Sequence, residues 1–244
     1  MSICHLIGNG PSCRLFDLRK GDRYGCNYPR LDIPYEACGF MDQNMPYWLE
    51  ITGHGSDLNW WTHKPLYDHT KQYELIKDYK LEGRLAWMPN TGACKARHLA
   101  DLYDEVHLWG FDSLFSNECS TLNDEVFNTT GRKRAQDCSS YWHILFEKEI
   151  APYGNFSCHM PVNTFTKTPV RGIRYIPTDE PEELLPLKKC FDQKVANWHL
   201  VNYVNYTEQI VNGEKLRAWF GDKVLIDHYQ EELENAEAQE IRDS

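Results

Sequence analysis

The sequence predicts an α/β fold with a Rossmann-like, mostly parallel sheet, flanking helices and a C-terminal helical appendage. Three observations carry this prediction. Residues 4–13 read as a buried strand that runs into a Gly-Asn-Gly-Pro turn and a helix start. Residues 83–112 alternate strand, helix and strand, an order that favours parallel pairing. Short strands that end in polar residues recur between positions 23 and 42.

The opening turn has the residue types of a phosphate-binding loop. Gly8 and Gly10 allow a sharp turn and a close ligand approach, Asn9 adds an amide, and Ser12 adds a hydroxyl at a helix start. Lys and Ser/Thr do not follow the second glycine, which excludes a Walker-type loop, and Cys13 stands where a dinucleotide fingerprint has its third glycine. An ordinary tight connection between strand and helix is the alternative.

Two short strands follow the opening turn. Residues 23–27 and 36–42 have the apolar pattern of strands, and each ends in a polar side chain, Asn27 or Asp42. In an open parallel sheet, ligands bind at the carboxyl ends of the strands. We therefore expect Asn27, Asp42 and Asn9 at the same edge.

The middle of the chain predicts a strand, a helix and another strand, and then one further helix and strand. Asn90 and Thr91 start the first helix, and Gly92 lies in the same turn. The predicted ranges are 83–89 (strand), 93–103 (helix), 105–109 (strand), 137–150 (helix) and 156–160 (strand). Residues 43–82 carry no clear pattern, and we expect Trp48, Trp60 and Trp61 in a helix and an irregular insertion.

A change of pattern at residue 161 divides the predicted domains. Prolines punctuate the next stretch, and helices are predicted near 192–212 and 222–241. We assign 1–160 to a nucleotide-binding domain and 161–244 to a loop-rich and helical appendage. The acidic last residues, 230–244, have the composition of a solvated helix or of a tail that binds a protein partner or a second copy of the chain.

Composition excludes some functions and compartments. The chain has 244 residues, of which 41% are hydrophobic and 25% charged. Its formal net charge of -10 disfavours binding to nucleic acid through an extended electrostatic surface. Neither a signal sequence nor an apolar run of about 20 residues is present, so we expect a cytoplasmic protein without a transmembrane segment. The 9 cysteines form no Cys-x-x-Cys pair, which predicts reduced, mostly buried thiols. The histidines lack zinc-site spacing.

With these segments placed, the first 160 residues or so resemble the bacterial lipo-oligosaccharide sialyltransferases. They resemble more loosely the 6-hydroxymethylpterin pyrophosphokinase-like family. The resemblance rests on Leu6-Ile-Gly-Asn-Gly-Pro-Ser12, on Gly25-Cys-Asn27, and on 90–92 followed by 106–112. A stand-alone protein of this size with such a turn also resembles phage-encoded products. If the chain is phage-encoded, the expected compartment is the host cytoplasm.

The resemblance implies a nucleotide site for a CMP-sugar donor. In that family the matching asparagines and hydroxyls contact the nucleotide, which implicates Asn9, Ser12, Asn27 and Thr91. Gly8, Gly10 and Gly92 would shape the backbone around them, and Asp42 joins the same edge. Amides, hydroxyls and helix N–H groups stabilise a leaving phosphate without a metal, and the chain has no Asp-x-Asp motif.

The chain departs from that family at the general base. The family's histidine follows a glycine before the helix at 137–150, where this chain has Gly131 and then Arg132, Lys133 and Arg134. Arginine can neutralise phosphate but cannot accept a proton from a hydroxyl at neutral pH. Asp112, His54 and His143, in that order, are the candidate bases.

We therefore expect a metal-independent glycosyltransferase-like protein that uses a nucleotide-activated sugar and a glycan or small-molecule acceptor, without a cofactor. Two alternatives stay open. One is an ATP-dependent pterin or nucleotide pyrophosphokinase, which would need Mg²⁺. The other is an inactive binding or structural protein that retains the fold.

Overall fold

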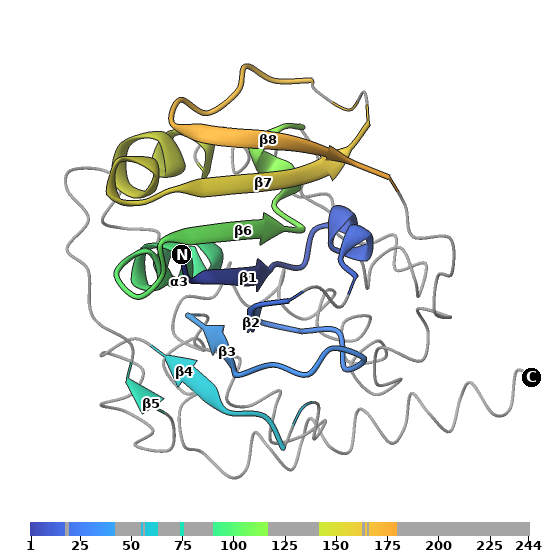
Figure 1. Ribbon diagram of the computed structural model, residues 1–244, viewed down its shortest axis with the longest axis vertical. Helices are drawn as coiled ribbons and strands as arrows, with labels where there is room; N and C mark the ends of the chain where they lie inside the picture. Colours follow the sequence, from blue (N-terminus) through green and yellow to red (C-terminus); the bar gives the residue numbers. More distant parts are fainter. Residues whose placement is uncertain are drawn as a thin grey trace, which may run out of the picture.

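A computed structural model describes residues 1–17, 20–41, 55, 57–62, 74–75, 90–116, 142–162, 164 and 166–179. They form an 8-stranded sheet in the order β5-β4-β3-β2-β1-β6-β7-β8 (Figure 1). Every neighbouring pair of strands is parallel. The predicted α/β, Rossmann-like class is therefore confirmed.

The strand bounds agree with the sequence pattern in the centre of the sheet. The strands are β1 (Ile3–Ile7), β2 (Asp22–Cys26), β3 (Ala37–Phe40), β4 (Trp60–Thr62), β5 (Glu74–Leu75), β6 (Glu105–Trp109), β7 (Phe156–Pro161) and β8 (Ile173–Thr178). The strand predicted at 105–109 has the observed bounds of β6, and the strands predicted at 23–27, 36–42 and 156–160 overlap β2, β3 and β7.

Two strands differ from the prediction. Trp60 and Trp61, expected in a helix or insertion, belong to β4, where Cys38 of β3 pairs with Trp60. Residues 173–178, expected in a loop-rich appendage, form β8 at the edge of the sheet. Short strands and edge strands carry little periodicity of their own, so pairing with a neighbouring strand determines them. The sheet thus continues past residue 160, where we had placed the domain boundary.

Helix α3 (Thr91–Ala100) covers one face of the central strands (Figure 1). Its Asn90 side chain accepts a hydrogen bond from the Ala93 N–H at 3.1 Å, which caps the helix start. Ala93, Ala96 and Leu99 are fully buried and pack with alternate residues of β1 and β6. The helix ends at Ala100, three residues before the predicted end at 103.

The other face of the sheet has a different character. A smaller apolar cluster covers part of it, formed by Ile7, Trp109 and residues of the 3₁₀ helix η1 (Pro11–Leu15) and the loop after it. The same face of the sheet also carries the buried polar side chains of His5 in β1 and of Ser157 and His159 in β7. Pro11 occupies the first turn of η1, as predicted.

The helix predicted at 137–150 is described from residue 142 onward. Residues 142–145 are α-helical and continue into η4 (Phe146–Ile150), which has π-helical geometry. A short 3₁₀ turn, η5 (Ala151–Tyr153), then leads into β7. The predicted elements at 83–89, 192–212 and 222–241 lie outside the described residues, as do residues 137–141.

The order in which successive strands join the sheet reverses at β1. Strands β2 to β5 follow on one side of β1, and β6 to β8 follow on the other. In open parallel sheets this switch point, at the carboxyl ends of the strands, is the usual place for a ligand. The loops after β1 and β6 meet there.

Candidate functional site

The loops after β1 and β6 are joined by backbone hydrogen bonds. The N–H of Gly8 donates to the carbonyl of Trp109 at 2.7 Å, and the N–H of Gly10 donates to the carbonyl of Gly110 at 2.9 Å. A Cβ atom on Gly8 would lie 2.7 Å from the Gly110 carbonyl oxygen. The glycines of the opening turn are therefore required for the contact between two protein loops, whether or not a ligand also approaches them.

A carboxylate occupies the start of η1. Both carboxylate oxygens of Asp112 lie 3.2 Å from the donating N–H of Ser12, and the Ser12 hydroxyl donates to Oδ2 at 2.7 Å. A Cβ atom on Gly10 would lie 2.1 Å from that Oδ2. Ser12 and Asp112 are both buried. Asp112, expected as a general base, thus binds the groups that we expected to bind phosphate.

Asn9 and Asn27 are brought close together by the strand ends. The Nδ2 of Asn9 donates to the carbonyl of Tyr28, the residue after Asn27. Asn27 directly follows β2, and its N–H donates to the Gly39 carbonyl of β3 at 2.9 Å. Its φ of 50° lies in the left-handed region, which asparagine tolerates better than most residues. The expected position of both amides at the carboxyl edge is confirmed.

Thr91 links the start of α3 to the ends of β2 and β3. Its hydroxyl donates to Oδ1 of Asn27 at 3.0 Å and accepts from the N–H of Met41 at 3.1 Å. These contacts determine which way each amide points. The Tyr28 carbonyl accepts, so the NH₂ group of Asn9 must face it, and the Thr91 hydroxyl donates, so the amide oxygen of Asn27 must face that hydroxyl. In the described part of the chain, Oδ1 of Asn9 and Nδ2 of Asn27 have no hydrogen-bond partner.

Gly92 has a packing role beside this site. A Cβ atom on Gly92 would lie 2.7 Å from the Phe111 ring, so the aromatic side chain lies directly against the helix start. Phe111 follows β6 and also packs edge-on against Phe146, with ring centroids 5.7 Å apart. The first turn of α3 is thereby held against the loop that carries Asp112.

Lys95 is a buried cation that the sequence pattern did not single out. It lies four residues after Thr91, hence one turn further along α3, and is fully buried. Its Nζ lies 3.9 Å from the centre of the Trp61 ring, and a Cβ atom on Gly39 would lie 2.7 Å from its Cδ. The sequence signal for a site role of Lys95 is its position four residues after Thr91 on the same helix. A lysine in a helix is usually exposed to solvent, so this spacing alone does not single it out.

Of the remaining candidates, the structure describes only His143. His143 lies on the helical segment before η4, and its Nε2 donates to the carbonyl of Thr168 at 2.6 Å. The other predicted site residues lie outside the described residues: Asp42, His54, Arg132, Lys133 and Arg134.

The described residues contain no group of three or more His, Cys, Asp or Glu side chains that could hold a metal ion. Of the helices described, none has both the length and the apolar character needed to cross a membrane.

The fold and the arrangement of polar side chains at its carboxyl edge define a class of protein. An all-parallel α/β sheet of the Rossmann type presents polar side chains from three separate segments at the carboxyl edge beside its switch point. No protein-family model, curated protein or solved structure matches this chain. The class is therefore an α/β protein with a nucleotide-binding type of fold.

Proposed function

We propose that this protein binds a nucleotide-activated sugar at the carboxyl edge of β1, β2 and β3. It then transfers the sugar to a glycan or small-molecule acceptor without a metal. The observation that carries the proposal is the meeting of Asn9, Asn27 and Thr91, which are far apart in sequence and joined through hydrogen bonds at one edge. The resemblance of the opening turn favours a CMP-sugar.

The chemistry of the cluster suits the neutral part of a nucleotide. The amide oxygen of Asn9 can accept, and the amide nitrogen of Asn27 can donate, which matches the polar edge of a base or the hydroxyls of a sugar. A phosphate at the start of η1 would meet the Asp112 carboxylate instead of free N–H groups. We therefore assign the phosphate to the basic run Arg132–Arg134 rather than to η1.

In the proposed reaction, a hydroxyl oxygen of the acceptor attacks the anomeric carbon of the donor. The bond from that carbon to the phosphate oxygen breaks, and the nucleotide leaves with the electron pair. The acceptor proton passes to a base, for which Asp112, His54 and His143 remain the candidates. The Ser12 contacts leave Asp112 less suited to this role than its sequence position implied.

Calorimetric titration of the full chain with CMP, UDP, GDP and ATP tests this proposal. The Asn27→Gly variant keeps a residue that tolerates the left-handed backbone but loses the amide, so we expect at least about tenfold weaker binding, together with a loss of stability of about 1 kcal/mol from the broken Thr91 hydrogen bond. Asn155→Gly is the matched control, because Asn155 lies before β7 at the opposite edge. Absence of binding to every nucleotide would contradict the proposal.

The Ser12–Asp112 contact favours one alternative, a binding protein that retains the fold without the transfer chemistry. In this alternative the acidic C-terminal segment docks a protein partner. An assay for release of free CMP from a CMP-sugar, with and without acceptor sugars, separates the two. Nucleotide binding without turnover supports the binding protein, whereas ATP binding that requires Mg²⁺ supports a pyrophosphokinase.

A further inference from the structure

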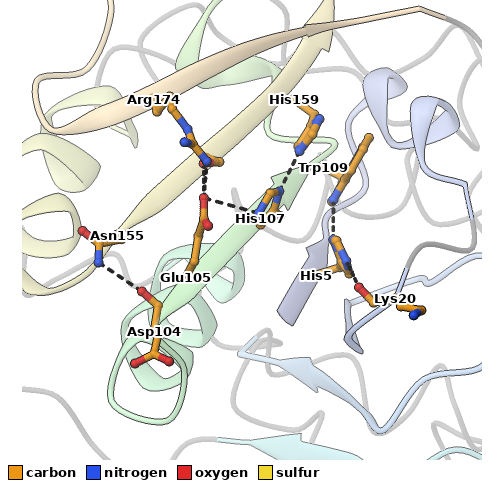
Figure 2. A network of polar contacts seen from close by, with 10 residues as sticks. His5, Lys20, Asp104, Glu105, His107, Trp109, Asn155, His159 and Arg174 are labelled. Carbon is orange, nitrogen blue, oxygen red and sulfur yellow. Dashed lines mark hydrogen bonds and ion pairs between the residues drawn. The ribbon is translucent and has the colours of Figure 1, made fainter. Parts of the chain in front are cut away.

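A chain of histidines crosses the sheet on the face opposite α3 (Figure 2). His5 of β1 pairs in register with His107 of β6, and His159 lies on neighbouring β7. Nδ1 of His107 lies 2.8 Å from Nε2 of His159. His5 and His159 are buried, and the His107 side chain is 16% exposed. None of these residues belongs to the proposed nucleotide site.

The proton on His159 is determined by its contact with β8. The Thr178 hydroxyl donates to the carbonyl of Ile176 at 3.1 Å, so its oxygen must accept from Nδ1 of His159, 2.9 Å away. Nδ1 of His159 therefore carries a proton. The ring also stacks on the Trp109 indole, with centroids 3.6 Å apart and an interplanar angle of 8°.

On the other side of His107 lies the carboxylate of Glu105. Oε1 of Glu105 accepts from the Ser157 hydroxyl at 2.7 Å and forms an ion pair with the Arg174 guanidinium. The Ser157 oxygen in turn accepts from Nε of Arg174 at 3.0 Å, which fixes the direction of its hydroxyl. Nε2 of His107 lies 3.4 Å from the same Glu105 oxygen, which is ion-pair distance, so a proton on this nitrogen is attracted to the carboxylate whereas a bare lone pair would be repelled.

Together these contacts favour one proton more than two neutral rings hold. Nδ1 of His159 and Nε2 of His107 each carry one, and the short contact between the rings needs one more. Three N–H protons on two imidazoles amount to one positive charge, because two neutral rings hold only two. The charge lies next to the Glu105 carboxylate and over the Trp109 ring, both of which stabilise it.

We propose that His107 and His159 share one proton more than two neutral imidazoles hold. This proton stabilises the contacts of the edge strand β8 with β6 and β7. The charged and titratable groups that face the pair from the described elements are His5 of β1, Glu105 of β6 and Arg174 of β8. Helix η1, which contacts β6 and β7, contributes one charged residue, Arg14.

His5 does not share this charge. The Trp109 Nε1–H donates to Nδ1 of His5 at 3.2 Å, so that nitrogen has no proton. Nε2 of His5 then donates to the Lys20 carbonyl at 2.9 Å, which completes a neutral ring.

The shared proton makes stability depend on pH in two directions. Histidines of the unfolded chain lose their protons above about pH 6.5, whereas the folded pair retains one. The folding equilibrium constant therefore falls as pH rises from there, by up to about tenfold per pH unit, until the pair deprotonates. Below about pH 6.5 the unfolded chain binds two protons on these residues and the pair only one, so stability falls again.

Urea unfolding of the full chain between pH 5.5 and 9, compared among variants, tests the proposal. We expect Glu105→Gln and His159→Gln to lose the fall in stability between pH 7 and 8, because the extra proton loses its countercharge or its second ring. His143→Gln is the matched control, since this ring contacts Thr168 and not the pair, and it should retain the fall. If the free energy of unfolding depended on pH equally in the wild type and in Glu105→Gln between pH 7 and 8, the proposal would be overturned.

A spectroscopic measurement on the wild type does not depend on the variants' folding. Ring ¹⁵N chemical shifts at pH 7.5 should show His5 neutral, and one protonation equivalent distributed over His107 and His159. Two neutral rings at these positions would overturn the proposal.

Discussion

The hydroxyl of Ser12 donates to a carboxylate oxygen of Asp112 at 2.7 Å, across 100 positions of sequence. The contact closes the loops after β1 and β6 over the switch point of the sheet. A turn that has the composition of a phosphate cradle is thus filled by an anion from the protein itself. A phosphate at this turn would therefore meet the Asp112 carboxylate instead of free N–H groups.

Removal of this contact should affect stability more than nucleotide binding. Asp112→Ala leaves the buried Ser12 hydroxyl and N–H without their acceptor, and we expect it to lower the free energy of unfolding by about 2–4 kcal/mol. Asp112→Asn retains one acceptor oxygen and should cost less. Urea denaturation measures the stabilities and calorimetry the affinity for CMP. A large loss of CMP affinity in a stably folded Asp112→Asn protein would assign Asp112 to the ligand site.

Gly10→Ala should destabilise the fold through the same contact. The new methyl group would lie 2.1 Å from Oδ2 of Asp112 and 2.6 Å from the Gly110 carbonyl oxygen, so the two loops must separate. We expect a loss of at least about 2 kcal/mol in urea unfolding. In an Asp112→Ala background the loss should be smaller, since only the carbonyl clash remains. Simple additivity of the two changes would contradict the proposed contact.

Thr91→Val tests the link between α3 and the strand ends. Valine keeps the shape but loses the hydroxyl that donates to Asn27 and accepts from the Met41 N–H. We expect a loss of about 1–3 kcal/mol in the free energy of unfolding and weaker nucleotide binding, because the Asn27 amide is no longer oriented. Thr91→Ser, which keeps the hydroxyl, is the control and should retain both properties. Equal behaviour of the two variants would exclude a role for the hydroxyl.

Buried thiols of the central strands should resist alkylation. Burial raises the pKa of Cys26 and of Cys38 from 9.0 to about 12. At pH 8 the thiolate fraction is then about a thousandfold below that of an ordinary thiol. Peptide mapping after iodoacetamide treatment should find both residues unmodified in the native protein and modified in urea. Rapid native modification of either would contradict their burial.

The same shifts predict a loss of stability in alkali. Because the folded pKa of these thiols lies above the unfolded value, the folded state retains protons that the unfolded state releases above about pH 9. Stability from these groups is complete below that pH and falls as pH rises toward 12. Cys26→Ala and Cys38→Ala should reduce the slope of unfolding free energy against pH in this range. An unchanged slope would mean that these thiols do not ionise on unfolding.

Local patterns were sufficient to predict the centre of the fold. Strand β6 and the starts of β1 and α3 follow from apolar runs, a helix-capping Asn90 and a Pro at the first turn of η1, all of which act within a few residues. The strands β4 and β8, farther from the centre of the sheet, were not predictable in this way. Trp60 and Ile173 enter strands because a neighbouring strand offers hydrogen bonds, and that neighbour is distant in sequence.

For the candidate site, the sequence determined the residue types and their order, and hence the expectation that Asn9, Asn27 and Thr91 meet at the carboxyl edge. Only the tertiary structure decided what each side chain contacts. Asp112 occupies the start of η1, Lys95 is buried under Trp61, and His107 faces His159. Hydrogen bonds and charges act over a few ångströms, and the fold alone brings residues separated by tens of positions within that range.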